Sequence, residues 1–333
     1  MEENRQAYQS KLTIRAVNLI YFIVMVLFIT IGNFVQAKGF NSGILITEFV
    51  LIALPPFVYI AAKKGNLKKE LRLNRLRLLD GVLIVFAFLF SYPVAVFLNL
   101  IGNLFISLFG PLMETPVPTP ENFNEFFILV MIVAGSAGLC EEVLFRGLVM
   151  RGCQRLGKWP AIIFTAVLFG GMHLNIQNFF GPMFLGILLG YVVYTTDSIF
   201  AGMLGHFTNN AFSVALSFVL MKLPFASSGV PENLPPGAEF QALLLATIPV
   251  GIFAVFSGAM GFLCLWGLKE LNRDRKTEDI LEEPESERQS IGRVLASPKL
   301  SWPLYLCVLI FIFFSVLQFA YVATGQSILD MIF

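Results

Sequence analysis

The sequence consists largely of continuous apolar runs, each long enough to form a membrane-spanning helix. Hydrophobic residues make up 56% of the 333 residues, charged residues only 14%, and the mean hydropathy is +0.76. Only helices and closed barrels can span a bilayer, because backbone N–H and C=O groups find no water there. The runs lack the alternation of apolar and polar residues that barrel strands have. The sequence therefore excludes an ordinary soluble domain and predicts an all-α, polytopic transmembrane helical bundle.

We expect about eight to nine spans. The candidate spans are residues 14–35, 43–62, 79–109, 126–150, 159–173, 179–195, 199–221, 241–268 and 302–323. The third of these is too long for one straight crossing, and Pro93 predicts either a kink or a break within it.

Basic residues fall on one side of this predicted bundle. With the N-terminus inside and nine crossings, 21 of the 23 Lys and Arg residues lie in inside segments, and only Lys38 and Lys222 lie outside. The positive-inside rule therefore predicts an inside N-terminus and an outside C-terminus. The net charge of +1 gives no basis for binding nucleic acid. The inside segments are the N-terminal tail, 63–77, 146–158, 196–198 and 269–299.

Three charged residues, Glu141, Glu142 and Arg146, interrupt one of the apolar runs. Charged side chains at membrane depth cost several kcal/mol, so they persist where a partner or a task offsets that cost. Residues four apart share a helix face, which predicts a structural Glu142–Arg146 ion pair and leaves Glu141 free to act as a general base or acid. From these residues alone, a purely structural cluster of all three charges is an equally good interpretation.

The only two histidines, His173 and His206, both lie in predicted spans. His206 and Asn210 are four residues apart and can address one point, while Asn209 is expected to be turned aside. Two histidines from separate spans, together with the carboxylates and an Asn, favour an active site.

Depth along the helices gives a check on this constellation. At ~1.5 Å per residue, Glu141 lies about 10–15 Å from the inside boundary and His206 about 10–12 Å. These two depths agree and predict a water-filled cavity that opens to the inside. His173 comes out deeper, at about 20 Å, which requires that its helix begins late or is tilted.

Three motifs stand in order along the chain: Glu-Glu-x-x-x-Arg at 141–146, Phe-x-x-x-His at 169–173 and His-x-x-x-Asn at 206–210. This set resembles the CPBP family, the intramembrane proteases that include the type II CAAX prenyl endopeptidases and bacteriocin-processing proteins, also called the abortive-infection family. The resemblance covers roughly residues 126–221.

The resemblance implies hydrolysis of a peptide bond within the membrane. Glu141, assisted by His173, would activate a water molecule. His206 and Asn210 would stabilise the resulting oxyanion. The ion pair predicted above would hold the shape of the site.

The family has also been described as metalloproteases. If zinc is used, Glu141, His173 and His206 would be its ligands, a set that is chemically acceptable with an open fourth position. The sequence has no His-Glu-x-x-His motif, in which one helix supplies two zinc-binding histidines. We therefore favour a metal-free glutamate mechanism that requires no cofactor, with zinc as the alternative.

On this interpretation the chain has four parts. They are N-terminal spans and loops in 1–125, a catalytic core in 126–221, a loop and the eighth span in 222–268, and a charged linker with an extra C-terminal span in 269–333.

The expected partners are membrane lipids and a membrane-associated peptide or protein, either CAAX-like and prenylated or a bacteriocin or leader-type peptide. The expected location is the plasma membrane of a prokaryote, with the active site open to the cytoplasm. The alternatives are a non-catalytic membrane scaffold or bacteriocin-immunity protein that keeps the fold, and an ion-coupled transporter. A scaffold does not need two histidines and an asparagine beside the carboxylates. An ion-coupled transporter often has matching spans in its two halves that are interrupted by Gly or Pro, and the sequence shows no such pair.

Overall fold

The structure is a computed structural model that describes residue 10 and residues 12–113, 119–223, 238–274 and 290–324. Helices account for 85% of these residues, and this part of the chain contains no strand. The prediction of an all-α fold is confirmed.

Seven helices of the described ranges are long and apolar enough to cross a membrane. They correspond to seven of the nine predicted spans. The other two are α10 (Lys158–Met172), which has only 15 residues, and α12 (Ile199–Met221). The polar side chains of His206, Asn209 and Asn210 reduce the apolar character of α12. The seven helices are Ile14–Lys38, Phe40–Ala62, Leu78–Ile106, Phe123–Gly152, Ile176–Thr196, Phe240–Leu271 and Ser301–Thr324.

The N-terminal part contains two antiparallel continuous helices, Ile14–Lys38 and Phe40–Ala62, which we call the first and second rods. A short helix and one long helix follow them. Both rods contain a π-helical segment, and the second of these precedes Pro55 and Pro56, which lack the N–H groups of a regular α-helical ladder. Pro93 does not break the long helix, which runs unbroken from Leu78 to Ile106 and ends three residues before the end of the third predicted span. The elements are α1 (Ile14–Leu27), η1 (Phe28–Gly32), α2 (Asn33–Lys38), α3 (Phe40–Ile46), η2 (Thr47–Ala53), α4 (Leu54–Ala62), α5 (Leu67–Glu70) and α6 (Leu78–Ile106).

The fourth membrane helix begins at Phe123, three residues before the predicted start. Asn122 caps it, because its side chain accepts a hydrogen bond from the Glu125 backbone N–H at 3.1 Å. The remaining elements are α7 (Phe123–Leu129), η3 (Val130–Ser136), α8 (Ala137–Glu142), η4 (Val143–Val149), α9 (Met150–Gly152), η5 (Gln154–Leu156), α10, η6 (Ile176–Asn178), α11 (Phe180–Thr196), α12, α13 (Ala238–Leu271), α14 (Ile291–Ala296) and α15 (Pro298–Thr324).

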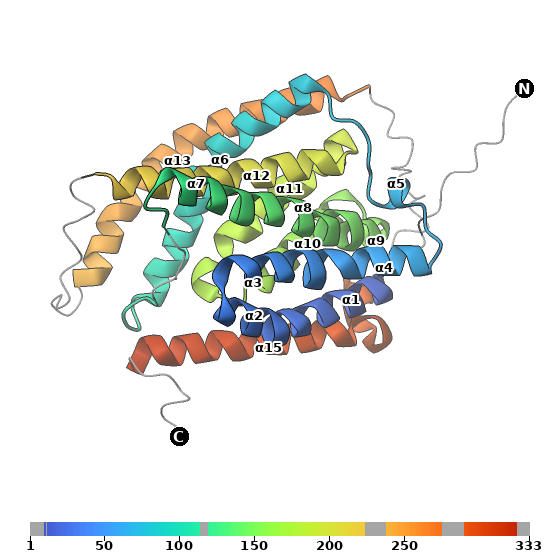
Figure 1. Ribbon diagram of the computed structural model, residues 1–333, viewed down its shortest axis with the longest axis horizontal. Coiled ribbons are helices and arrows are strands. Elements are labelled where there is room, and N and C mark those ends of the chain that lie inside the picture. Colours follow the sequence, from blue (N-terminus) through green and yellow to red (C-terminus); the bar gives the residue numbers. More distant parts are fainter. Residues whose placement is uncertain (1–9, 11, 114–118, 224–237, 275–289, 325–333) are drawn as a thin grey trace, which may run out of the picture.

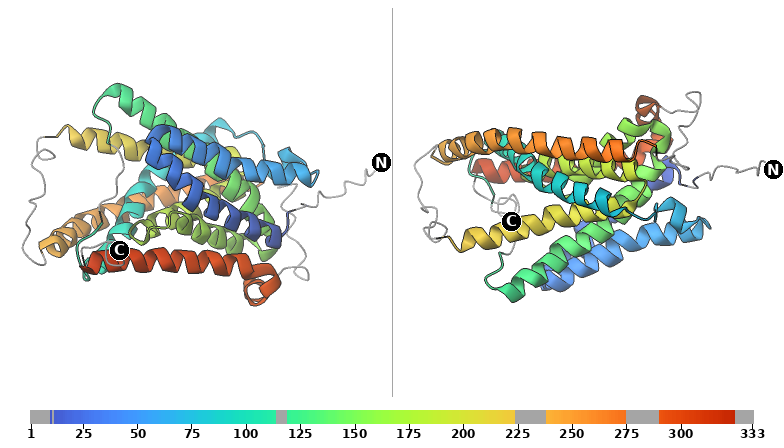
Figure 2. Two further views of the ribbon diagram at one scale, coloured as in Figure 1. Left: turned by 60° about the horizontal axis from the view of Figure 1, so that its bottom comes forward. Right: turned by 90° about the horizontal axis from the view of Figure 1, so that it is seen from above.

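The helices surround a central group formed by α8, α11 and α12 (Figure 1). α13 packs along α6 on one side, and α15 packs along α1 on the other. The helices cross obliquely, as Figure 2 shows. α10 and α11 approach closely at Gly186, where a Cβ atom would lie 2.9 Å from the Cα of Ala166. Small residues at such crossings allow membrane helices to pack tightly.

The predicted inside segments meet at one end of the bundle, which we call the basic end and which lies at the right of Figure 1. Arg72 pairs with Asp197 at 3.5 Å, and Arg151 pairs with Glu70 at 3.5 Å. Arg77 donates a hydrogen bond to the backbone carbonyl of Leu271 at 3.4 Å. Segments 63–77, 146–158, 196–198 and 269–272 are therefore neighbours, as the predicted topology requires. The side of the membrane that the basic end faces stays a prediction.

We expect opposite labelling of cysteines placed at the two ends of the bundle. Lys68 is exposed at the basic end, and Asn124 is exposed in the first turn of α7. In intact cells a membrane-impermeant maleimide should label Asn124→Cys, and it should label Lys68→Cys only after permeabilisation. The reverse pattern would show that the basic end faces outward.

Candidate functional site

A buried charged network lies at the centre of the bundle. Arg146 Nη1 donates a hydrogen bond to Glu142 Oε1 at 2.8 Å, and both side chains are fully buried. His206 Nδ1 lies 3.0 Å from the same Glu142 oxygen. Arg146 Nη2 donates to the backbone carbonyl of Gly186 at 3.1 Å. The predicted i,i+4 ion pair is present, and it also joins α8 to α11 and α12.

Neighbouring side chains fit closely around this network. A Cβ atom on Gly202 would lie 2.4 Å from Glu142 Oε2, so α12 can pass the carboxylate only because residue 202 is glycine. The Arg146 guanidinium carbon lies 4.7 Å from the centre of the Phe169 ring, a cation–π contact. The same ring meets His173 and His206 edge to face. The Phe169 ring therefore packs against Arg146 and both histidines at once.

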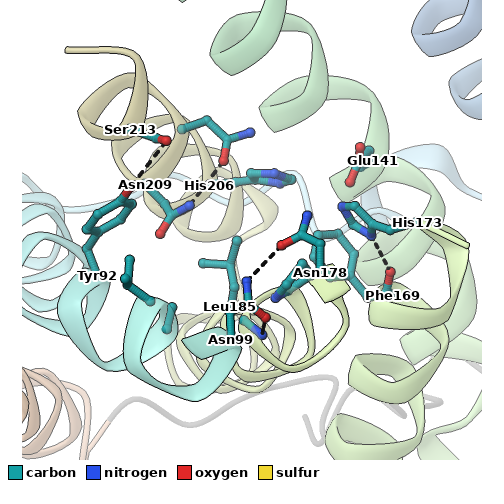
Figure 3. A pocket seen from close by; sticks show the side chains of 15 residues that line it. Tyr92, Asn99, Glu141, Phe169, His173, Asn178, Leu185, His206, Asn209 and Ser213 are labelled. Atoms are coloured by element: carbon teal, nitrogen blue, oxygen red, sulfur yellow. Dashed lines mark hydrogen bonds between the residues drawn. The ribbon is translucent and has the colours of Figure 1, made fainter. Parts of the chain in front are cut away.

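A cavity of about 240 Å³ adjoins the network (Figure 3). Glu141, His173, His206 and Asn210 all line it. These residues come from α8, from the position directly after α10, and from α12, so the fold brings together three separate stretches of the sequence. Glu142 and Arg146 stand behind the lining. The other lining residues are Tyr92, Ala95, Val96, Asn99, Phe169, Asn178, Gly181, Pro182, Leu185, Asn209 and Ser213.

Backbone and carboxylate acceptors orient both histidines. His173 Nδ1 lies 3.0 Å from the carbonyl oxygen of Phe169, and His206 Nδ1 bonds to Glu142. A carbonyl or an arginine-paired carboxylate only accepts, so we assign the N–H to Nδ1 in both rings. Nε2 is then left for the cavity in each histidine. Figure 3 shows the His173 ring beside the Glu141 carboxyl group.

The two asparagines of α12 both reach the cavity. Asn210 Nδ2 donates to the carbonyl of Val133 at 3.3 Å, and Asn209 Nδ2 donates to Asn210 Oδ1 at 3.1 Å. The expectation that Asn209 is turned aside is therefore wrong. The cavity is wide enough to take side chains from adjacent positions of α12, which diverge by about 100°.

The cavity also has a polar wall that motif reasoning missed. The Tyr92 hydroxyl donates to Ser213 Oγ at 3.2 Å, and Asn99 Nδ2 donates to Asn178 Oδ1 at 2.8 Å. The Gly181 backbone N–H donates to Asn99 Oδ1 at 2.7 Å. A polar residue inside a membrane-spanning apolar run often belongs to a functional site. Asn99 could have been identified as a site residue on that ground.

The lining extends from the middle of the bundle away from the basic end. His173 follows the last residue of α10, and Asn178 and Gly181 lie at the start of α11, whose far end Thr196 belongs to the basic end. Oblique crossing brings residues of unequal depth along their own helices to one point. The side of the bundle on which the cavity opens stays a prediction.

Glu141, His173 and His206, the predicted ligands of the zinc alternative, all line the cavity, and the choice between glutamate and zinc chemistry stays a prediction. Zinc needs three protein ligands at about 2 Å from one ion. In the described ranges no three His, Cys, Asp or Glu side chains are placed to hold a metal ion together.

Residues 123–212 match the family described as type II CAAX prenyl endopeptidase Rce1-like. The match confirms the resemblance inferred from the three motifs, and it includes all six predicted site residues. No curated protein and no solved structure matches the chain. The chain is therefore an integral membrane protein with an Rce1-like segment at its centre, and that family implies CAAX-type intramembrane protease activity.

We predict that Arg146→Met strongly destabilises the protein. The substitution leaves Glu142 buried without its cation, which costs about 3–5 kcal/mol for a buried pair. Thermal unfolding of the purified protein in detergent micelles measures the loss. The matched control is Arg273→Met, because Arg273 is 78% exposed and pairs with Glu270 at 3.7 Å. Equal losses in the two variants would contradict a special role for the buried pair.

Proposed function

We propose that this protein is an intramembrane endopeptidase that hydrolyses a peptide bond of a membrane-associated substrate. One observation carries the proposal: a single cavity collects Glu141, His173, His206 and Asn210 from three helices. The family match supports the same reaction class. A membrane scaffold would gain nothing from two oriented histidines that face a shared space.

In the proposed reaction, Glu141 and His173 activate water. A water molecule between them transfers one proton to the Glu141 carboxylate while His173 Nε2 accepts its other hydrogen bond. The water oxygen attacks the scissile carbonyl carbon, and the C=O bonding pair moves onto the carbonyl oxygen. Glu141 then delivers its proton to the amide nitrogen as the C–N bond breaks, so the base returns to its starting state.

His206 and Asn210 stabilise the oxyanion in this proposal. Asn210 Nδ2 uses one hydrogen for Val133 and retains a second for the substrate. His206 can donate from Nε2 when that atom also carries a proton. Glu142 holds Nδ1 and thereby keeps the ring in place for this contact. Prepositioned donors of this kind supply a large electrostatic contribution, and losing one costs about 10²–10³ in rate.

For the substrate we propose a CAAX-like prenylated peptide ahead of a bacteriocin or leader-type peptide. The description of the matching family supports this order. Membrane lipids surround the helices, and we propose the plasma membrane of a prokaryote as the location. The lining extends from the middle of the bundle towards the end opposite the basic end, so the labelling experiment also decides which side of the membrane the lining extends towards.

We predict that Glu141→Ala and His206→Ala abolish cleavage. Loss of the general base Glu141 lowers the rate by about 10²–10⁴-fold, and loss of the oxyanion donor His206 lowers it by about 10²–10³-fold. The assay uses purified protein in proteoliposomes and a synthetic peptide that ends in a farnesylated CAAX sequence. Glu121→Ala, at an exposed position outside the cavity, is the control. Full activity of both site variants at equal membrane content would refute the protease proposal and favour the scaffold.

If the wild-type protein leaves the farnesylated peptide intact, the CAAX-like substrate is wrong. Peptides that accumulate in cells carrying Glu141→Ala, compared with cells carrying the wild-type protein, then identify the class that is cleaved.

The metal-free mechanism gives a separate prediction. Dialysis against a strong chelator should leave cleavage unchanged, because Glu141 acts directly on water. Loss of activity on chelation that added zinc restores would overturn the glutamate mechanism in favour of a zinc site.

A further inference from the structure

The C-terminal helix α15 makes a polar contact with residues 173–179, which we call the His173 loop, although α15 lies outside the segment 123–212 that matches the family. The contact comes from Gln318, a half-buried polar residue in this apolar, membrane-spanning helix. An amide that is withdrawn from water at membrane depth costs free energy unless it is hydrogen-bonded, so the partners of Gln318 indicate its task.

Both ends of the Gln318 amide bind the backbone of the His173 loop. Nε2 donates a hydrogen bond to the carbonyl oxygen of Leu174 at 2.8 Å, and the backbone N–H of Ile176 donates to Oε1 at 2.9 Å. A carbonyl only accepts and a backbone N–H only donates, so these two partners fix which end of the amide faces each of them. One side chain of α15 therefore holds two backbone groups, one on each side of Asn175.

The loop adopts a backbone conformation that needs support. α10 ends at Met172, and Leu174, two residues later, has a φ of +49°. This left-handed region is usually occupied by glycine at the end of a helix, because a Cβ atom there crowds the following carbonyl. A residue in such a conformation persists where the surrounding structure fixes it. The carbonyl of Leu174 is the group that Gln318 binds, so the support acts at the strained residue itself.

The His173 loop supplies two residues to the cavity. His173 stands at its start and Asn178 near its end, and both line the cavity. A second amide, that of Gln177, ties the loop to the segment after α6. Its Nε2 donates to the Met113 carbonyl at 3.2 Å, and its Oε1 accepts from the Met113 N–H at 3.1 Å. The loop is therefore held by two other parts of the chain, one of which is α15.

We propose that Gln318 is a positioning residue for the hydrolysis proposed above, on which this inference rests. Its amide fixes the backbone directly after His173 and so holds Nε2 of that ring in the place from which it binds the water beside Glu141. α15 is then a part of the active enzyme and not only an added membrane anchor. His173 also belongs to the zinc alternative, so the inference does not depend on which chemistry operates.

Gln318→Met tests this role, because methionine keeps the length of the side chain and removes both hydrogen bonds. We expect kcat for peptide cleavage to fall roughly 10- to 100-fold with little change in KM, since a displacement of about 1 Å near the reacting groups has such an effect. Tyr321→Phe is the matched control, because it removes a polar group from an exposed position of the same helix. Equal falls in the two variants would overturn the inference.

Hydrogen exchange tests the contact without any substrate. The Ile176 amide donates to Gln318, so it should exchange roughly 10-fold faster in Gln318→Met, the factor that corresponds to one net hydrogen bond, while exchange in α8 should not change. Unchanged exchange at Ile176 would overturn the inference. If the variant fails to fold, the wild-type protein decides: an Ile176 amide that exchanges as fast as the same amide in a short peptide refutes the contact.

The two proposals fail in different ways. If Glu141→Ala is inactive and Gln318→Met cleaves like the wild type, the protease proposal stands and the positioning role is wrong. If Glu141→Ala is active, the protease proposal is refuted, and the positioning role falls with it even where hydrogen exchange shows the contact.

Discussion

The hydrogen-bonded carboxylate of Glu142 is the interaction on which the centre of the bundle depends. The carboxylate binds Arg146 on the same membrane helix and His206 on α12, and Arg146 donates a hydrogen bond to the Gly186 carbonyl on α11. Burying such charges costs desolvation free energy, and removing one partner leaves the other charge buried without compensation. The network therefore sets a relative position of three helices that an apolar core of interchangeable side chains would not define. Gly202 belongs to the same arrangement, since any side chain there would collide with the carboxylate.

The residues that hold the site in shape and the residues proposed to react occupy different positions. The groups that carry compensating charges lie behind the cavity wall, and the groups with spare hydrogen-bonding capacity line it. The supporting contacts also fix which nitrogen of His173 and His206 faces the cavity. α8, which carries Glu141 and Glu142, is a six-residue α-helical stretch between the π-helical segments η3 and η4. π-helical turns are frequent at functional sites, and here they flank the acidic pair directly.

Local periodicity accounts for what could be predicted. Apolar runs of helix length predicted the all-α membrane fold, and i,i+4 spacing predicted the pairing of Glu142 with Arg146. Both follow from the geometry of a single helix, which a sequence specifies by itself. The same reasoning failed for α12, where it turned Asn209 away from the site, because a helical wheel gives a direction and not the width of the space that the helix faces.

The sequence by itself therefore determined the class of fold, the family resemblance and the candidate residues for the site. The tertiary structure alone decided that His206 bonds to Glu142 and that Asn99 and Tyr92 complete the cavity. Each of these contacts joins different helices. Their existence depends on crossing angles and close approaches that packing of whole surfaces sets, and no spacing along one helix encodes them.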